Sequence, residues 1–368
     1  MLETEQTARP ILQWIFVGST PHSYMLKQAL VVLLLISTSL SGCLEEGGEI
    51  PEEDRGDADG PFSIIEDGIF SCIEHGNLTR CWQTHIPENL DPEESVPLII
   101  DMHGYASDST NHRKLSSFDT IADEEGAIVI YPDGVLGLNM AWDLEENQAW
   151  NAGWCCAHSA RDDIDDLGFI EKIVNISLEK HNVDSNRVYA SGWSNGCAMA
   201  QMLAMESSHI FAAVGCMAMY LITEPVEDYT PIPVMEVHGF LDQVVLYEST
   251  ALSVPFNEEM WTNPEAYDTG AIENIYEWAD YNGCPGPLET LELNGLYSIQ
   301  GFENCENETS IRLMTIYAAQ HNPYSNDVDD GSIIGSGFIG TQGLVESSHI
   351  VWDFISQYSK DEGSVSPE

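Results

Sequence analysis

The five residues Gly192-Trp193-Ser194-Asn195-Gly196 set a serine between two glycines in the G-x-S-x-G pattern of a nucleophile elbow. Nucleophilic attack needs this pattern because a sharp turn between a strand and a helix lifts the serine Oγ clear of the sheet. The glycines let the two elements approach closely. The flanking residues fit, since 187–192 predicts a strand and 195–206 predicts a helix. We therefore predict that Ser194 is a nucleophile rather than a plain helix N-cap.

An acid and a base follow at the ends of two later predicted strands. Asp242 lies three residues beyond the strand 233–239, and His321 lies four residues beyond the strand 311–317. The chain order serine, acid, histidine is the order of the α/β-hydrolases. We predict that His321 accepts the serine proton and that Asp242 orients its imidazole.

Two other residues compete for these roles. Glu236 lies inside its predicted strand rather than beyond it. His349 lies on the predicted helix 346–358, where a surface or capping position is more typical. Both are the weaker candidates.

An acyl-transfer intermediate also needs N–H donors for its oxyanion. One should be the N–H of Asn195, directly after the serine, and the other should come from an early strand–helix loop. The predicted strand 96–102 ends in the turn His103-Gly104-Tyr105-Ala106-Ser107. We expect the N–H of Tyr105 to be the second donor and His103 to pack beneath the loop.

These residues need a sheet whose strand ends meet at one edge. Short apolar runs alternate with helical patterns, which predicts an α/β fold with a mainly parallel central sheet and helices on both faces. The expected strands are 96–104, 127–134, 187–192, 212–218, 233–239 and 311–317, and the expected helices are 116–125, 164–180, 195–206, 271–281 and 346–358. Before them, 69–75 and 79–87 predict an N-terminal hairpin.

Aromatic residues near these motifs could line a cleft for a planar acyl group or a sugar, although such side chains more often pack in the core. The candidates are Tyr105, Trp150, Trp154, Trp193 and Tyr247. We find no metal-ligand constellation and no phosphate-cradling glycine loop, and 327–331 lacks the full calcium-loop spacing. We therefore predict no metal and no cofactor.

With these motifs in place, the chain from about residue 66 to 358 resembles the esterase family that includes polyhydroxybutyrate depolymerases, feruloyl esterases and acetylxylan esterases. The resemblance rests on the elbow, the HG turn at 103–104, the HG-x-x-D turn at 238–242, the segments 131–134, 150–156, 165–170 and 184–189, and cysteines 284 and 305. Two features depart from the family. The histidine lies in AAQHNPY (318–324) instead of a GGH-x-WPG loop, and 248–270 looks like an insertion that could form part of a lid.

The resemblance implies an α/β-hydrolase fold and a serine carboxylic ester hydrolase that acts on polymer-linked esters. These would be feruloyl or acetyl esters of polysaccharide, or short polyhydroxyalkanoate-type polyesters. A prolyl-oligopeptidase-like peptidase is the alternative enzyme, disfavoured because no propeller-sized extra domain is present. A non-catalytic surface binding module on the same fold is the other alternative, but it would not need serine, acid and histidine together.

The acidity of the chain limits its partners. It has 368 residues, of which 12 are basic and 61 acidic, for a formal net charge of −49. Segment 45–59 nets −7 and 1–42 nets zero, which leaves about −42 on the remaining domain. Such a surface repels nucleic acid and anionic headgroups and favours solubility in saline surroundings. We predict no nucleic-acid partner, and nothing in the sequence indicates an oligomeric state.

Cysteine usage favours disulfides. None of the nine cysteines falls in a paired C-x-x-C zinc spacing, and eight remain apart from Cys43, an even number that in an exported chain favours bridges over buried free thiols. Cys72 and Cys81 should close the hairpin, and the family resemblance implies a bridge from Cys284 to Cys305. The four others would then pair across two groups, in an order that stays open: Cys155 and Cys156 with Cys197 and Cys216.

The N-terminal part predicts export. The apolar run 29–40 after Lys27 has the length of a signal-peptide core, and residues 40–43 (LSGC) resemble a lipobox that would leave Cys43 lipidated. Met25 would be a natural start for this leader, which makes 1–24 a possible gene-start artefact. We expect an extracellular protein, either secreted or held at the cell surface, that meets a membrane only through this lipid.

The expected domain organisation follows from these segments. It comprises a leader (1–42, with its signal core at 26–42), an acidic disordered tether (43–62), an esterase domain (63–360) and a short tail (361–368).

If Cys43 is lipidated, the full-length protein should fractionate with membranes and the Cys43→Ser variant should be soluble. Lipoprotein processing adds two or three acyl chains, and a single chain binds a membrane only marginally. Fractionation and mass spectrometry of the mature N-terminus test this. Equal distribution of the two proteins, or an unmodified residue 43 inside a longer chain, would remove the lipoprotein interpretation.

Overall fold

The computed structural model describes residues 64–91, 93–138, 146–153, 155–221, 223–248, 270–325 and 343–360. All of them belong to the second of the two units, 1–60 and 61–368, into which the chain divides. Several predictions lie outside the described residues: the leader, the tether up to residue 62, lipidation of Cys43, the role of Trp154, segment 327–331, the tail, and nearly all of the insertion 248–270.

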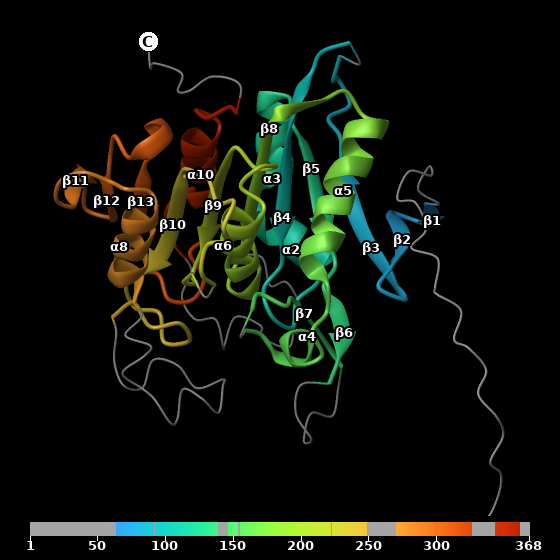
Figure 1. Cartoon of the computed structure of the whole chain (residues 1–368), viewed down its shortest axis with the longest axis horizontal. Helices are drawn as coiled ribbons and strands as arrows, with labels where there is room; N and C mark the ends of the chain where they lie inside the picture. The colour runs from blue at the N-terminus through green and yellow to red at the C-terminus, as the bar shows by residue number, and fades with distance from the viewer. Residues whose placement is uncertain are drawn as a thin grey trace, which may run out of the picture. The chain divides into compact units, whose positions relative to one another are not determined.

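The centre of the described structure is an 11-stranded sheet with the order β1-β2-β3-β5-β4-β8-β9-β10-β13-β12-β11 (Figure 1). Its middle strands are mutually parallel, so their carboxyl ends lie at one edge. These strands are β5 (Ile128–Pro132), β4 (Val96–Met102), β8 (Val183–Gly192), β9 (Ala213–Met217), β10 (Val234–Gly239) and β13 (Ile311–Ile316).

Antiparallel strands flank the parallel ones. At one edge lie β1 (Ile65–Asp67), β2 (Phe70–His75) and β3 (Leu78–His85), so the predicted N-terminal hairpin is confirmed. At the other edge lie β12 (Tyr297–Phe302) and β11 (Glu289–Leu293), which the sequence analysis missed. Every residue of β11 is exposed, so burial imposes no clear apolar alternation on it. The short strands β6 (Val135–Gly137) and β7 (Asn147–Ala149) pair separately.

Helices cover both faces of the sheet, each over its own hydrophobic cluster. In Figure 1, α5 (Asp166–Lys180), α6 (Asn195–Glu206) and α8 (Ala271–Tyr281) lie in front of the sheet. The opposite face carries α2 (Ser109–Ser116), α3 (Phe118–Glu125) and α10 (Ser347–Ile355). The expected helix 116–125 is thus α3 alone, separated from α2 by Ser117 at φ 62°. Short helices occur at α4 (Ala157–Arg161) and η2 (Glu306–Glu308). The predicted α/β-hydrolase class is confirmed.

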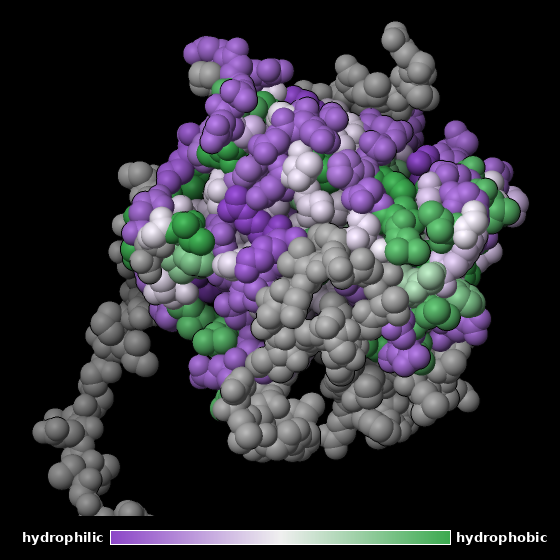
Figure 2. All heavy atoms as spheres, turned by 180° about the vertical axis from the view of Figure 1, so that it is seen from behind, coloured by the Kyte–Doolittle hydropathy of each residue, from purple (hydrophilic) through white to green (hydrophobic). Residues whose placement is uncertain are grey.

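Hydrophilic residues cover most of the visible described surface on the side opposite to Figure 1 (Figure 2). None of the helices in the described ranges is long and apolar enough to cross a bilayer.

Four disulfides join the eight described cysteines. Cys72–Cys81 and Cys284–Cys305 are as predicted. The predicted pairing among the other four is wrong, because Cys155 bonds Cys156 and Cys197 bonds Cys216. Cys197 lies in the first turn of α6 and Cys216 on β9, and these elements pack together with the two Cα atoms 5.0 Å apart. Sequence spacing could not reveal that contact between a helix and a strand.

A peptide map of the unreduced protein should therefore show Cys197 linked to Cys216. The double variant Cys197→Ala/Cys216→Ala should lose roughly 3 kcal/mol of unfolding free energy, since the bridge closes a loop with a sequence separation of 19. Urea unfolding measures the loss, with Cys72→Ala/Cys81→Ala as the matched variant. Peptides that join Cys155 or Cys156 to Cys197 or Cys216 would contradict the observed pairing.

Candidate active site

Ser194 lies in the sharp turn between β8 and α6. Its backbone has φ 54° and ψ −120°, a region that non-glycine residues rarely adopt. The surrounding backbone holds this conformation, because Ser194 N–H donates to the Met217 carbonyl at 2.8 Å and Ser194 O accepts from Ala198 N at 3.0 Å. The sequence therefore forms the predicted elbow, with Asn195 as the first residue of the helix.

Two glycines permit the close backbone contacts of the site. A Cβ on Gly196 would collide with the Met102 carbonyl and lie 2.6 Å from the His103 carbonyl, so α6 can approach the end of β4 only without a side chain there. A Cβ on Gly239 would lie 2.6 Å from the Ala319 carbonyl. The loop after β10 therefore packs directly on the loop after β13.

The ends of β8, β10 and β13 bring three predicted residues together. His321 Nε2 lies 2.9 Å from Ser194 Oγ, and His321 Nδ1 lies 2.7 Å from Asp242 Oδ2. His321 and Asp242 are 3% and 4% exposed. Burial opposes ionisation of Asp242, but the charge and hydrogen bond of His321 hold the pKa of Asp242 below its ordinary value. The imidazole is thus held between a hydroxyl and a carboxylate.

The alternative candidates for the base and the acid, His349 and Glu236, do not join this arrangement. His349 is on α10, 37% exposed, with its Nε2 3.6 Å from Glu124 Oε2. Glu236 is fully buried inside β10 and bonds His238. Neither contacts Ser194 or His321 in any described interaction.

His103 fixes the backbone of the turn 103–107 that follows β4, as expected. Its Nε2 accepts from Gly134 N–H at 2.9 Å, so its proton is on Nδ1, which donates to the Gly104 carbonyl at 2.7 Å. Burial lowers the pKa of His103 to about 3, so the ring is neutral. Because C=O and N–H of a trans peptide point in opposite directions, fixing the Gly104 carbonyl also fixes the direction of the Tyr105 N–H.

Trp150 joins this turn to the elbow, a role that the sequence analysis missed. Its backbone N–H donates to Asn195 Oδ1 at 2.8 Å, and its carbonyl accepts from Asn195 Nδ2 at 3.1 Å. Its indole N–H donates to the His103 carbonyl at 2.9 Å. Asn195 N–H, at the first position of α6, has no intrahelical acceptor. A polar residue directly after the serine was the only sequence signal for this contact.

The expected aromatic cleft needs correction. Trp150 is fully buried and Trp193 is 2% exposed, with its indole N–H donating to the His321 carbonyl at 2.8 Å. Both therefore pack beneath the site instead of lining a cleft, because their N–H groups are used to hold backbone. Tyr105 is half-buried. Tyr247 is half-buried and lines a groove of about 510 Å³ beside the loop after β10 that carries Asp242, here called the acid loop. The other residues that line this groove are Phe240, Leu241, Ser298, Thr315 and Tyr317.

A second hollow lies far from these residues. It measures about 550 Å³ and is lined by Val96, at the opposite end of β4, and by acidic loop residues such as Asp91 and Glu94. Ser194, Asp242 and His321 are not among its lining residues. Across the described ranges, no group of three or more His, Cys, Asp or Glu side chains is placed to hold a metal ion.

Comparison with known proteins shows which proteins the chain is similar to. Residues 86–252 match the family described as Esterase PHB depolymerase. Feruloyl esterase B of Piromyces equi is 28% identical over 279 residues, which cover 74% of this chain and 44% of that protein. A bifunctional acetylxylan esterase/xylanase of Neocallimastix patriciarum is 23% identical, over 75% of this chain and 33% of that protein.

The chain is thus similar to the polyhydroxybutyrate depolymerase, feruloyl esterase and acetylxylan esterase-like family that its motifs resemble. The chain spans less than half the length of those two relatives. An acetyl xylan esterase from Aspergillus awamori has a solved structure with 16% identity and a TM-score of 0.44, covering 71% of this chain and 94% of that chain. That similarity is too low to add to the assignment.

The neutral state of His103 predicts a pH dependence of stability. Its folded-state pKa is depressed, so the unfolded chain binds a proton that the folded chain does not, and the free energy of unfolding should fall as the pH drops from about 6.5 to about 3. One such proton gives a slope of about 1.4 kcal/mol per pH unit. Urea unfolding should show that His103→Gln lacks this component.

The matched control for that series is His349→Gln, which changes an exposed histidine on α10 and should leave the slope unchanged. A His103→Gln protein with the wild-type slope would contradict a neutral buried ring.

Proposed function

We propose that this protein is a secreted or surface-anchored serine esterase and that Ser194, His321 and Asp242 form its catalytic triad. The observation that carries the proposal is the unbroken hydrogen-bonded line from Ser194 Oγ through His321 to Asp242, built from the ends of three parallel strands. The strained elbow supports it, because such backbone strain is typical of functional sites. Four disulfides fit an extracellular location, and the lipid on Cys43 would be the only membrane contact.

The proposed reaction is acyl transfer through a covalent intermediate. Ser194 Oγ attacks the ester carbonyl while His321 Nε2 takes its proton, and the N–H groups of Asn195 and Tyr105 stabilise the oxyanion. The tetrahedral intermediate collapses, and His321 returns the proton to the departing alcohol. Water then attacks the acyl-enzyme by the same route, releasing the acid and regenerating Ser194. Asp242 holds the imidazole in the required tautomer throughout.

The proposed substrates are feruloyl or acetyl esters on polysaccharide, or short hydroxyalkanoate polyesters. The feruloyl esterase and acetylxylan esterase relatives support the first class, and the family match supports the second. Tyr247 and the exposed Phe240 form an aromatic wall beside the acid loop that suits a planar acyl group or a sugar ring. The strongly acidic chain favours a neutral polymer over an anionic one.

Replacing Ser194 by Ala should lower kcat on a chromogenic ester by about 10⁵–10⁶, and Asp242→Asn should cost less, about 10⁴, since the carboxylate acts only through His321. Ser191→Ala, on the same strand but outside the triad, is the matched control and should keep its activity. Retained turnover in Ser194→Ala would remove the nucleophile assignment.

The substrate class is tested by comparing methyl ferulate, acetylated xylan, a hydroxybutyrate oligomer and a peptide amide side by side. At least one ester should be hydrolysed and the peptide should not. Cleavage of the peptide alone would favour a peptidase, and cleavage of none would favour a binding module.

A further inference from the structure

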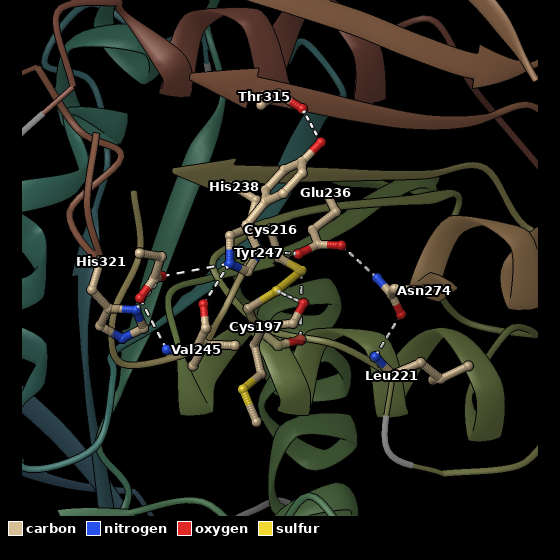
Figure 3. Close-up of polar contacts among 12 residues, drawn as sticks. Cys197, Cys216, Leu221, Glu236, His238, Val245, Tyr247, Asn274, Thr315 and His321 are labelled. Carbon is tan, nitrogen blue, oxygen red and sulfur yellow. Dashed lines mark hydrogen bonds and ion pairs between the residues drawn. A yellow bond between two sulfur atoms is a disulfide. The ribbon is translucent and has the colours of Figure 1, made fainter. Parts of the chain in front are cut away.

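A second buried histidine–carboxylate pair, Glu236 and His238 (Figure 3), lies next to Asp242. Glu236 and His238 both point from β10 and both are fully buried. His238 Nδ1 lies 2.6 Å from Glu236 Oε1, and His238 Nε2 lies 2.8 Å from the Val245 carbonyl and 3.5 Å from Asp242 Oδ2. The triad thus continues into a second pair that the mechanism above does not use.

The contacts of His238 fix where its protons can be. A carbonyl only accepts, so the bond to Val245 requires a proton on Nε2. The bond from Nδ1 to Glu236 then holds one further proton, located either on the ring or on the carboxyl group. The pair is therefore either an imidazolium with a carboxylate or two neutral groups.

The surroundings favour the charged form. Glu236 Oε2 accepts from Asn274 Nδ2 at 2.6 Å, so both carboxylate oxygens have donors. Burial raises the pKa of Glu236, although the hydrogen bonds from His238 and Asn274 act against this rise. Burial lowers the pKa of His238, but the hydrogen bond and charge of Glu236 and the charge of Asp242 raise it above its ordinary value overall. Two rings contact His238, Tyr220 stacked on its face and Tyr247 edge-on.

The other titratable groups near Glu236 and His238 do not oppose protonation of His238. Burial raises the pKa of both tyrosines, so they are neutral. Glu273 of α8 and Glu248 after the acid loop act on those tyrosines from outside the pair, and both are acidic. Among the described residues, His321 is the other titratable group that acts on Asp242. Carboxylates therefore dominate the surroundings of His238, which stabilises a cation there.

We propose that Glu236 and His238 form a buried ion pair that positions Asp242 and places a positive charge beside it. Val245 links the two pairs, because its carbonyl accepts from His238 while its N–H donates to Asp242 Oδ1 at 2.9 Å. The ion pair thereby fixes the acid loop and partly balances the charge of Asp242. Glu236 and His238 are positioning residues, and their effect on turnover rests on the proposed triad.

The protonation of His238 is tested without any activity. In protein labelled with ¹⁵N in its histidine rings, and with His238 assigned through its own backbone, both ring nitrogens should remain protonated from about pH 5 to 8. An unprotonated nitrogen on His238 at neutral pH would overturn the ion pair. Because this result does not depend on turnover, it is distinguishable from a failure of the proposed esterase function.

The effect on turnover is tested with Glu236→Gln and His238→Gln. A glutamine at 236 can donate to a neutral His238 and accept from Asn274, so it keeps the shape of the cluster and removes its charge. We expect kcat to fall about tenfold with KM nearly unchanged. The acid limb of the pH profile of kcat/KM should move to higher pH, because Asp242 then favours the protonated base more strongly. The double variant should cost no more than the worse single variant.

The control is Asp184→Asn, which removes a carboxylate paired with Arg187 at the opposite end of β8 and should leave the pH profile unchanged. Thermal unfolding of every variant separates stability from catalysis. The proposal fails if Glu236→Gln lowers stability alone and keeps the wild-type pH profile, or if Asp184→Asn moves the acid limb equally.

Discussion

The close approach of α6 to the end of β4 is the constraint on which the site depends. Gly196 lies against the Met102 and His103 carbonyls, and this contact fixes both the direction of the helix and the strained backbone of Ser194. The same contact sets the elbow beside the turn that carries Tyr105. Any side chain at 196 would separate the two proposed oxyanion donors, so one glycine controls the position of these donors and of the proposed nucleophile.

The loops after β10 and β13 obey a similar constraint on the other side of the serine. Gly239 lets them touch, and Leu241 N–H donates to the Ala319 carbonyl at 3.0 Å. Asp242 and His321 are therefore set by backbone contacts between their own loops, with Trp193 holding the His321 carbonyl from below. The strongly acidic chain adds little to this geometry, because exposed charges are screened by salt while these contacts are buried.

The sequence predicted those features whose signals are local. The elbow, the acid and the base each follow an apolar run of strand length, and their order along the chain is enough to set them at one edge of a parallel sheet. The link between Trp150 and Asn195, and the bridge between Cys197 and Cys216, depend on contacts between elements distant in sequence. Strand β11 was missed although its signal would be local, because an exposed edge strand has no buried face to impose an alternation of apolar and polar residues.

Two buried histidines near the proposed triad, His103 and His238, differ in charge because their neighbours differ. His103 bonds only backbone groups, a Gly134 N–H and a Gly104 carbonyl, so burial keeps it neutral. His238 also holds a backbone carbonyl, that of Val245, but two carboxylates face it and favour a cation. His103 holds the Gly104 carbonyl, which shares its peptide with the proposed oxyanion donor Tyr105 N–H, and His238 holds the carbonyl of Val245, whose own N–H donates to Asp242. In the proposed mechanism, negative charge develops only transiently near Tyr105, and the N–H donors stabilise it without a charge on His103. Asp242 is a permanent carboxylate, beside which a positive ring compensates the cost of burial.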